Sequence, residues 1–283
     1  MKGQTRTGTF VLNLDRSSDR MEWMASQLAA FGIPYSRMAA IDAERDNLDA
    51  ALRSLGVRIG KPKERPLGRV EIACYLTHLA TLRLAIAKGY AAILVLEDDV
   101  EILADLNPVL DQFAEFEDKP YILKLEPWKL PNWQVTVAKF ATIDVAYTPE
   151  PIWLAASYCI SRAAMKRAVA RLTELRNPID HELCSYSRAG LTVLLSSPPL
   201  AIQKTQHFGS LLEAERAALE ANATSLRLRM KKIWGLQKFV ALYENLIWLV
   251  RPFWQASRQS GVRTALRLRF RSPRAPDGYN RRP

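Results

Sequence analysis

One segment constrains the fold of this chain more than any other. Residues 91–96 are all apolar, and they lead directly into three consecutive carboxylates, Glu97, Asp98 and Asp99. A continuous apolar run of this length is typical of a strand buried on both faces of a parallel sheet. Open α/β sheets bind their ligands beyond the carboxyl ends of such strands. The segment therefore predicts a central strand with an acidic site at its end.

Strand and helix patterns alternate along most of the chain. Residues 9–14 predict a strand, apolar residues at helical spacing from Met21 to Phe31 predict a helix, and residues 35–41 predict a second strand, which together form a βαβ unit. This alternation indicates an open, mostly parallel α/β sheet flanked by helices. Residues 42–68 are polar and broken by Gly and Pro, and we expect a loop excursion there. The other expected elements are helices over 70–88 and 161–175 and strands over 91–96, 121–125, 135–140 and 191–195.

The net charge of +11 is concentrated at the C-terminal end. Residues 221–283 hold 14 lysines and arginines against two acids, whereas residues 1–220 are close to neutral. Basic residues alternate there with tryptophan and aliphatic residues, as in helices that adsorb on anionic lipid. We therefore expect a folded body, 1–220, and a basic helical tail, 221–283, with a boundary near 210–225 and a disordered end. The expected partner of the tail is an anionic membrane surface; nucleic acid and packing on the body are the alternatives.

Cysteine usage and the N-terminus bear on the compartment. Cys74, Cys159 and Cys184 form no CxxC pair and no zinc-type cluster, which favours a reducing compartment and thiols that pack as small core residues. The N-terminus lacks the apolar core of a signal peptide, and no uncharged apolar run is long enough to span a bilayer. We expect a cytoplasmic protein that is peripheral on the inner face of the membrane.

The three adjacent carboxylates favour a metal site. Like charges at one strand end repel one another, and a hard divalent cation such as Mn²⁺ or Mg²⁺ offsets both that repulsion and the cost of desolvation. The alternative is a solvated strand end whose acids cap a helix. Neither GxxxxGK[ST] nor GxGxxG occurs, so P-loop and dinucleotide-binding proteins are disfavoured. The expected contacts to a nucleotide are instead in the polar turn after the first strand, at Asn13, Asp15, Arg16 and Arg20.

Seven blocks occur in order along the chain: VLNLDRSSDRMEWM, VEIACYLTHLATLRLA, ILVLEDDV, YILKLE, SYCISRAAM, NPIDHEL and AIQKTQHFGS. In this order they resemble the blocks of glycosyltransferase family 25, the lipooligosaccharide and collagen-type galactosyltransferase group. The resemblance covers about residues 8–213. It implies a GT-A-like α/β fold and transfer of a hexose, most often galactose, from a UDP-sugar with inversion at the anomeric carbon. The implied acceptor is a lipooligosaccharide, the lipopolysaccharide core or another glycan.

The resemblance also implies roles for individual residues. The acidic DxD-like motif of the family falls on residues 97–99, which makes Asp99 and Glu97 metal contacts and Asp98 a contact to the donor. The helix block places Glu71, Cys74 and His78 on the wall of the donor site. The last block adds Gln203 as a donor contact and His207 as a candidate third metal ligand.

Inverting transfer needs one general base to take the proton of the acceptor hydroxyl. The Pro-x-Asp block of the family falls on Asp180, which is therefore the first candidate, with Glu182 and Glu126 as alternatives. A structural alternative for Asp180 is the N-cap of a helix over 182–188.

Two other classes of function fit parts of this pattern. One is a non-catalytic membrane or nucleic-acid adaptor on a nucleotide-sugar-like fold, and the other is a metal-dependent nucleotidyltransferase or phosphohydrolase. The acids Glu97, Asp99 and Asp180 favour an enzyme over an adaptor. Release of UDP from a UDP-sugar distinguishes the transferase from both alternatives.

Overall fold

The computed structural model describes residues 6–62, 65–126, 131, 134–140, 143–148, 152–184, 190–204 and 215–216. Its centre is an eight-stranded mixed sheet. The strands of that sheet are β1 (Thr7–Asn13), β2 (Ser36–Ala39), β4 (Ala92–Glu97), β6 (Tyr121–Lys124), β7 (Val135–Phe140), β8 (Ile143–Tyr147), β9 (Ser157–Ser161) and β11 (Thr192–Ser197). Two small sheets pair β3 (Arg58–Ile59) with β10 (Glu174–Leu175) and β5 (Val100–Ile102) with β12 (Ala201–Gln203).

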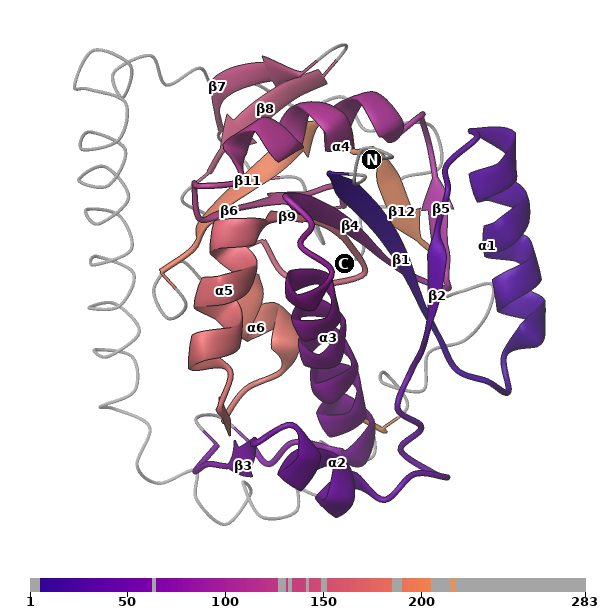
Figure 1. Ribbon diagram of the computed structural model, residues 1–283, viewed down its shortest axis with the longest axis vertical. Coiled ribbons are helices and arrows are strands. Elements are labelled where there is room, and N and C mark those ends of the chain that lie inside the picture. Colours follow the sequence, from indigo (N-terminus) through magenta and orange to yellow (C-terminus); the bar gives the residue numbers. More distant parts are fainter. Residues whose placement is uncertain are drawn as a thin grey trace, which may run out of the picture.

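The strand order of the large sheet is β2-β1-β4-β9-β6-β11-β8-β7 (Figure 1). Strands β9 and β8 run opposite to all the others. The predicted fold class, a mostly parallel α/β sheet flanked by helices, is confirmed. The sheet is more mixed than expected because β9 is inserted between β4 and β6 and pairs antiparallel with both.

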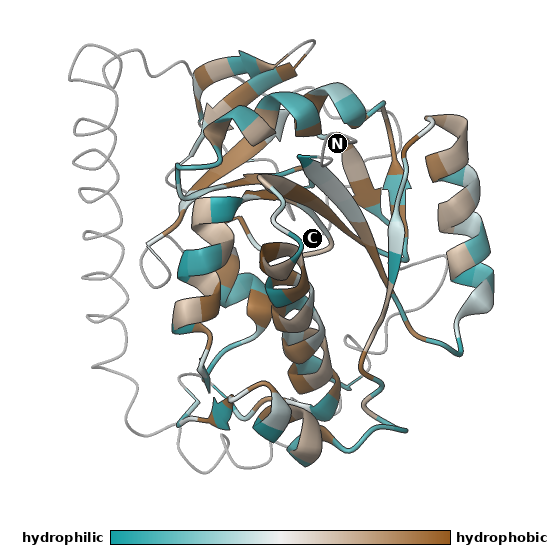
Figure 2. Cartoon of the chain, viewed as in Figure 1, coloured by the Kyte–Doolittle hydropathy of each residue, from teal (hydrophilic) through white to brown (hydrophobic). Residues whose placement is uncertain are grey.

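Helices cover both faces of this sheet. Helices α3 (Arg69–Ala87), α5 (Arg162–Arg171) and α6 (Ile179–Cys184) share one apolar cluster with the strands, and α1 (Ser18–Ala30) and α4 (Asn107–Phe113) share the other. The central strands and α3 carry mostly hydrophobic residues (Figure 2). Two short elements complete the helical part, α2 (Leu48–Ser54) and the 3₁₀ helix η1 (Ala114–Phe116).

Strand β4 lies at the centre of the core because it is apolar on both faces. Ile93 and Val95 face the cluster that contains α3, whereas Leu94 and Leu96 face the cluster that contains α1 and α4. Successive side chains of a strand point to opposite faces, so an unbroken apolar run is required here. Each of these fully buried side chains contributes roughly 1.5–3 kcal/mol of hydrophobic stabilisation.

The topology places a crevice at the carboxyl end of β4. Strand β1 lies between β2 and β4 and is parallel to both, so the chain leaves β1 first to one side and later returns on the other. Ligands of open α/β sheets bind where the strand order reverses in this way. The register pairs Leu12 with Glu97, which sets the end of β1 beside the acidic segment.

Helix α3 is long and apolar enough to span a bilayer, the one such helix among the described residues. More than half of its most apolar window, 56%, is buried inside the protein. Its apolar character is therefore explained by its position in the core.

Some elements differ from the prediction. The expected loop at 42–68 contains α2 and β3, because Asn47 caps a short amphipathic turn by accepting a hydrogen bond from the Ala50 N–H at 3.0 Å. The helix expected over 161–175 ends at Arg171 and is followed by β10. Helix α6 begins at Ile179, so Asp180 lies in its first turn and not at an N-cap. The predicted boundary near 210–225 and the tail, 221–283, lie outside the described residues.

Candidate active site

A cavity of about 210 Å³ opens at the carboxyl ends of β1 and β4. It brings together most of the side chains that the sequence singles out, although they come from segments far apart in the chain. The predicted site residues that line it are Arg16, Arg20, Glu71, His78, Glu97, Asp98, Asp99, Asp180 and Gln203. Four others, Asn13, Asp15, Glu126 and Glu182, do not line it, and His207 lies outside the described residues.

Two carboxylates of the acidic segment share one amide. The Gln203 side chain donates from Nε2 to both oxygens of Asp99 at 3.2 Å and lies 3.4 Å from Glu97 Oε2. Burial, together with the neighbouring charges of Glu97 and Asp98, raises the pKa of Asp99 to about 7. Carboxylates held this close in a dry site favour a bound cation.

Asp98 has a different environment from its neighbours. Its Oδ2 accepts a hydrogen bond from Asn13 Nδ2 at 2.8 Å, and its Oδ1 lies 3.3 Å from Arg20 Nη1. Burial raises the pKa of Asp98 although Asn13 and Arg20 act in the opposite direction. Asn13 also accepts from Arg37 Nε at 2.8 Å, so its contribution is to orient Asp98 from outside the cavity.

The other two polar residues of the turn after β1, Arg16 and Asp15, form salt bridges. Arg16 lines the cavity and pairs with Asp42, Nε to Oδ2 at 3.2 Å, and with Glu44. The hydrogen bond to Glu44 raises the pKa of Arg16. Asp15 pairs with Arg37, and its side chain is 76% exposed, so it faces solvent and not the cavity.

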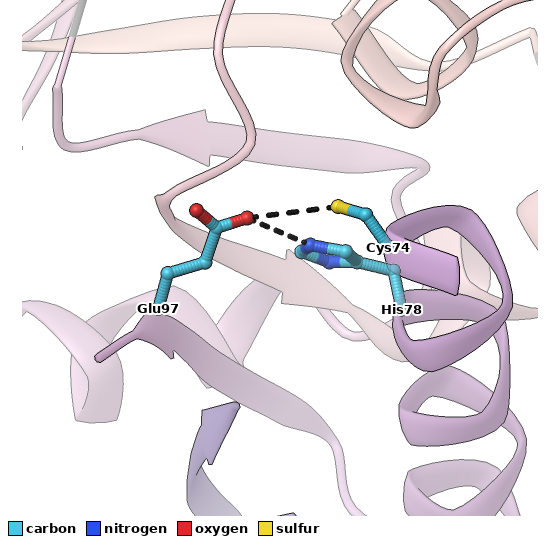
Figure 3. A group of neighbouring side chains, drawn as sticks. All are labelled: Cys74, His78 and Glu97. Atoms are coloured by element: carbon cyan, nitrogen blue, oxygen red, sulfur yellow. Dashed lines mark hydrogen bonds and ion pairs between the residues drawn. The ribbon is translucent and has the colours of Figure 1, made fainter. Parts of the chain in front are cut away.

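His78 and Cys74 approach Glu97 from helix α3 (Figure 3). His78 Nε2 lies 3.3 Å from Glu97 Oε1, and Cys74 Sγ lies 3.9 Å from the same oxygen. On the other side of the ring, His78 Nδ1 is hydrogen bonded to the Tyr158 hydroxyl at 2.9 Å. Burial raises the pKa of the Cys74 thiol well above its usual value, and the charge of Glu97 acts in the same direction.

Glu71 anchors the N-terminal end of α3. Arg65 binds both of its oxygens at 2.7 and 2.6 Å, Arg216 Nε donates to Oε1 at 2.7 Å, and the Gly68 N–H donates at 3.1 Å. Burial acts to raise the pKa of Glu71, but these hydrogen bonds outweigh it and the pKa is lowered. The carboxylate therefore holds Arg216 at the cavity wall.

The candidate bases lie in different places. Asp180 lines the cavity, and its Oδ1 accepts a hydrogen bond from the His181 N–H at 3.0 Å. Glu182 lies on the same helix but is hydrogen bonded to Asn177 and does not line the cavity; burial raises its pKa. The geometry therefore favours Asp180 over Glu182 for contact with a substrate.

Glu126 follows β6 and is buried behind Gln203. Its Oε1 accepts the Gln203 N–H at 2.6 Å, and no described residue bonds to its Oε2. Burial raises the pKa of Glu126 to about 8. Its role in the described geometry is to hold the β12 backbone rather than to meet a ligand.

Cys74 was expected both on the donor-site wall, through the family resemblance, and as a small core residue; it lines the cavity, one helical turn from His78. Sequence reasoning missed several other residues in and around this site. Arg216 lies beyond the expected blocks. Lys124 is fully buried, donates to the Leu154 carbonyl and lies 5.4 Å above the Tyr158 ring. Leu154 lines the cavity in the left-handed backbone region, with φ of 75°, which no sequence pattern predicts for a branched residue.

Comparison with known proteins gives a family match and similar relatives. The family model described as glycosyltransferase family 25 (LPS biosynthesis protein) matches residues 6–183. The lacto-N-neotetraose biosynthesis glycosyltransferase LgtE of Neisseria meningitidis serogroup B is 25% identical over 258 residues, which cover 81% of this chain and 89% of LgtE. The lacto-N-neotetraose biosynthesis glycosyltransferase LgtB of the same organism is 26% identical over 231 residues, which cover 73% of this chain and 82% of LgtB.

Two further similarities are more distant or more local. A Homo sapiens protein named inactive glycosyltransferase 25 family member 3 is 32% identical over 111 residues, which cover 38% of this chain and 18% of that protein. Among solved structures, a mutant Drosophila beta-1,4-galactosyltransferase 7 in complex with manganese, UDP-Gal and xylobiose has a TM-score of 0.40 and 12% identity, covering 72% of this chain and 74% of that chain.

The family match spans more than half of this chain. It includes β1, α3, β4 and the segment up to Leu183, and thus nearly all the residues that line the cavity. The chain is a glycosyltransferase, and it belongs to glycosyltransferase family 25.

Proposed function

We propose that this chain transfers a hexose, with galactose as the first candidate, from a UDP-sugar to a lipooligosaccharide, a lipopolysaccharide core or another glycan, with inversion at the anomeric carbon. One observation carries the proposal: Glu97, Asp98 and Asp99 line a single cavity together with Arg16, Arg20 and Asp180. The names of LgtE and LgtB, both lacto-N-neotetraose biosynthesis glycosyltransferases, support a glycan acceptor.

The acidic residues fit a divalent cation. Asp99 is 5% exposed beside Glu97 and Asp98, and its pKa is raised first by burial and then by these like charges, which a cation would offset. Glu97 and Asp99 would hold Mn²⁺ or Mg²⁺, and the bound ion would act as a Lewis acid on the diphosphate leaving group. Gln203 keeps the two carboxylates together through its side-chain amide.

The other polar residues orient the donor and the acceptor. Asp98 is fixed by Asn13 and Arg20, and it can accept hydrogen bonds from the hydroxyls of the donor. Arg16, Arg20 and Arg216 line the cavity, each paired with a carboxylate, and their guanidinium groups would also donate to a diphosphate.

Asp180 is the proposed general base. Its carboxylate is oriented by the His181 N–H and takes the proton of the acceptor hydroxyl as that oxygen forms the new glycosidic bond. The bond between the anomeric carbon and the diphosphate breaks in the same step, and UDP leaves.

Purified full-length protein should release UDP from UDP-galactose in the presence of Mn²⁺ and a glycan acceptor. Asp99→Asn should abolish this release while Asp111→Asn, on an exposed position of α4, should not. Unchanged release in Asp99→Asn would overturn the role of the acidic segment.

The non-catalytic alternative is disfavoured by the family match, although one human relative that matches 38% of this chain is named as inactive. Binding of UDP-galactose without UDP release, across several acceptors, would favour it. Release of pyrophosphate from UTP and a sugar 1-phosphate would instead indicate a nucleotidyltransferase.

We also propose that the basic tail, 221–283, attaches the enzyme to the anionic inner face of a membrane, where a lipid-linked acceptor would be available. The charge pattern of the tail supports this proposal.

A further inference from the structure

We propose that Cys74, His78 and Glu97 form a binding site for a thiophilic divalent cation such as Zn²⁺, beside the hard-cation position at Asp99 and sharing Glu97 with it. The three ligand atoms all lie within 4.8 Å of one another (Figure 3). Binding at this site does not depend on the proposed sugar transfer.

The distances are close to those of a tetrahedral zinc site. Zinc bonds of roughly 2.0–2.3 Å to nitrogen, oxygen and sulfur require ligand atoms about 3.3–3.7 Å apart. His78 Nε2 and Glu97 Oε1 are 3.3 Å apart, and Cys74 Sγ and Glu97 Oε1 are 3.9 Å apart. The third pair, Cys74 and His78, lies within 4.8 Å, so the half-buried Cys74 side chain would move toward His78 when a cation binds.

The three ligands are mounted on regular structure. Cys74 and His78 are separated by one turn of α3 and therefore project from the same helix face, and Glu97 is the last residue of β4. Side chains fixed by a helix and a central strand hold a site more rigidly than loop residues do.

A second, independent observation also points to a metal ligand. His78 is fully buried, and the Tyr158 hydroxyl at 2.9 Å from Nδ1 fixes the ring so that Nε2 faces Glu97 and Cys74. Histidines that bind metals almost always have their other ring nitrogen held by such a hydrogen bond.

The ligand types select the cation. A thiolate and an imidazole suit Zn²⁺ better than Mg²⁺ or Mn²⁺, which prefer carboxylate, carbonyl and water oxygens. On binding, the Cys74 thiol loses its proton to solvent and the sulfur bonds to the metal. Three protein ligands leave a fourth position, and all three of these residues line the cavity. Because Glu97 is shared, occupation of this site would compete with a hard cation at Asp99.

Cobalt(II) is the probe of choice, because a Co²⁺–thiolate bond gives a charge-transfer absorption band in the near ultraviolet. Titration of the full-length protein with Co²⁺ should give this band, and Zn²⁺ should abolish it. Cys74→Ala should lose the band. Cys159→Ala and Cys184→Ala remove the other two cysteines of the chain and should keep it. No band in the wild-type protein, or a band that persists in Cys74→Ala, would overturn the proposal.

Tyr158→Phe tests the orientation of His78 without removing a ligand. Its Zn²⁺ affinity, measured by competition with a chromophoric chelator, should fall roughly 10–100-fold. An affinity equal to that of the wild type would contradict the geometry proposed for His78. A cobalt band in a protein that releases no UDP would leave this site standing and overturn only the proposed transfer from a UDP-sugar. The competition at Glu97 can be tested by adding Zn²⁺ to reactions that contain Mg²⁺. Zn²⁺ should inhibit UDP release by the wild type but not by Cys74→Ala.

Discussion

The backbone and the side chain of Gln203 connect carboxylates from two different strands. Its N–H donates to Glu126 Oε1 at 2.6 Å, beyond the end of β6, and its Nε2 donates to Asp99 at 3.2 Å, beyond the end of β4. A single residue of β12 therefore links the buried Glu126 to the acidic segment. Its neutral amide donates to Asp99 and to Glu97 without adding a charge, so the repulsion between the two carboxylates remains for a bound cation to offset.

Replacement of this amide by a carboxylate should make the site depend on metal. Gln203→Glu adds a negative charge beside Glu97 and Asp99, so without divalent cations we expect a lower melting temperature than the wild type at neutral pH. Added Mn²⁺ should raise the melting temperature of the variant more than that of the wild type, as measured by differential scanning fluorimetry. Gln134→Glu is a matched control, because Gln134 is also buried but bonds to Ser197; its response to Mn²⁺ should equal that of the wild type. Equal responses of all three proteins would contradict a cation site here.

Kinetic measurements on variants should distinguish the two candidate bases Asp180 and Glu182. Asp180→Asn keeps the shape and the hydrogen bond from the His181 N–H but removes the basic oxygen, so kcat should fall by roughly 10²–10⁴. Glu182→Gln should change kcat far less, because Glu182 does not line the cavity. Steady-state rates of UDP release would decide between them. A larger loss in Glu182→Gln than in Asp180→Asn would reverse the assignment.

The stability of the metal-free protein should fall as the pH rises. The folded-state pKa of Glu126 is raised from 4.5 to about 8, and that of Asp99 from 3.8 to about 7, so the folded state holds these protons more tightly than the unfolded state. Their contribution to stability is complete below the unfolded values and is lost as the pH rises through 7 and 8. Glu126→Gln should therefore melt higher than the wild type at pH 9 and no higher at pH 5, with a difference of about 2–4 °C for each kcal/mol.

Melting curves in a metal chelator from pH 5 to pH 9 measure this effect. Glu22→Gln, at an exposed position of α1, is the matched control and should follow the wild type throughout. Parallel curves for Glu126→Gln and the wild type would contradict the raised pKa.

The large elements of this fold follow from local patterns. The apolar run of β4, the βαβ unit of β1, α1 and β2, and helix α3 were all predictable, because each is long enough to show its own period and ends in a clear signal. The three acids directly after β4 also indicated where the site lies, because ligands of open α/β sheets bind beyond the carboxyl ends of such strands. Strand β9 was not predicted, since its five buried residues have no alternation that separates a strand from the start of the following helix.

The interior of the site is set by tertiary contacts. The sequence assigned Glu97 and Asp99 to a metal and Asp98 to the donor, but it did not show which side chains hold them; the structure pairs Glu97 with His78, Asp98 with Asn13 and Asp99 with Gln203. These partners lie on other elements, and only the packing of α3 and β12 against β4 brings them together. Glu126 shows the same limit, because its burial depends on β12 and not on its neighbours in the chain.

The tail should bind anionic membranes through its charge. Replacement of Arg227, Arg229, Lys231 and Lys232 by Gln in the full-length protein removes four basic residues. At roughly 1 kcal/mol for each, the affinity for vesicles that contain phosphatidylserine should fall by about 10³. Co-sedimentation with these vesicles, compared with neutral vesicles and with a DNA fragment, measures the effect. Unchanged sedimentation of the variant, or tighter binding of the wild type to DNA than to lipid, would contradict membrane attachment.

Glu71 should matter for stability through two arginines at once. The carboxylate is 1% exposed and binds Arg65 and Arg216, so Glu71→Gln removes the charge that both guanidinium groups require. Because the arginines are partly exposed, the cost should be about 1–3 kcal/mol and not the larger loss of a fully buried pair. The pKa of Glu71 is lowered in the folded state, so this contribution is present above its ordinary value of 4.5 and disappears as the pH falls through the lowered pKa. The difference in melting temperature between wild type and Glu71→Gln should therefore be full at pH 7 and shrink at strongly acidic pH. A double-mutant cycle with Arg216→Gln tests the contact itself. The losses of stability in the two single variants should sum to more than the loss in the double variant, because the contact between Glu71 and Arg216 is broken in either one. Additive losses would mean that this contact contributes nothing to holding Arg216 at the cavity.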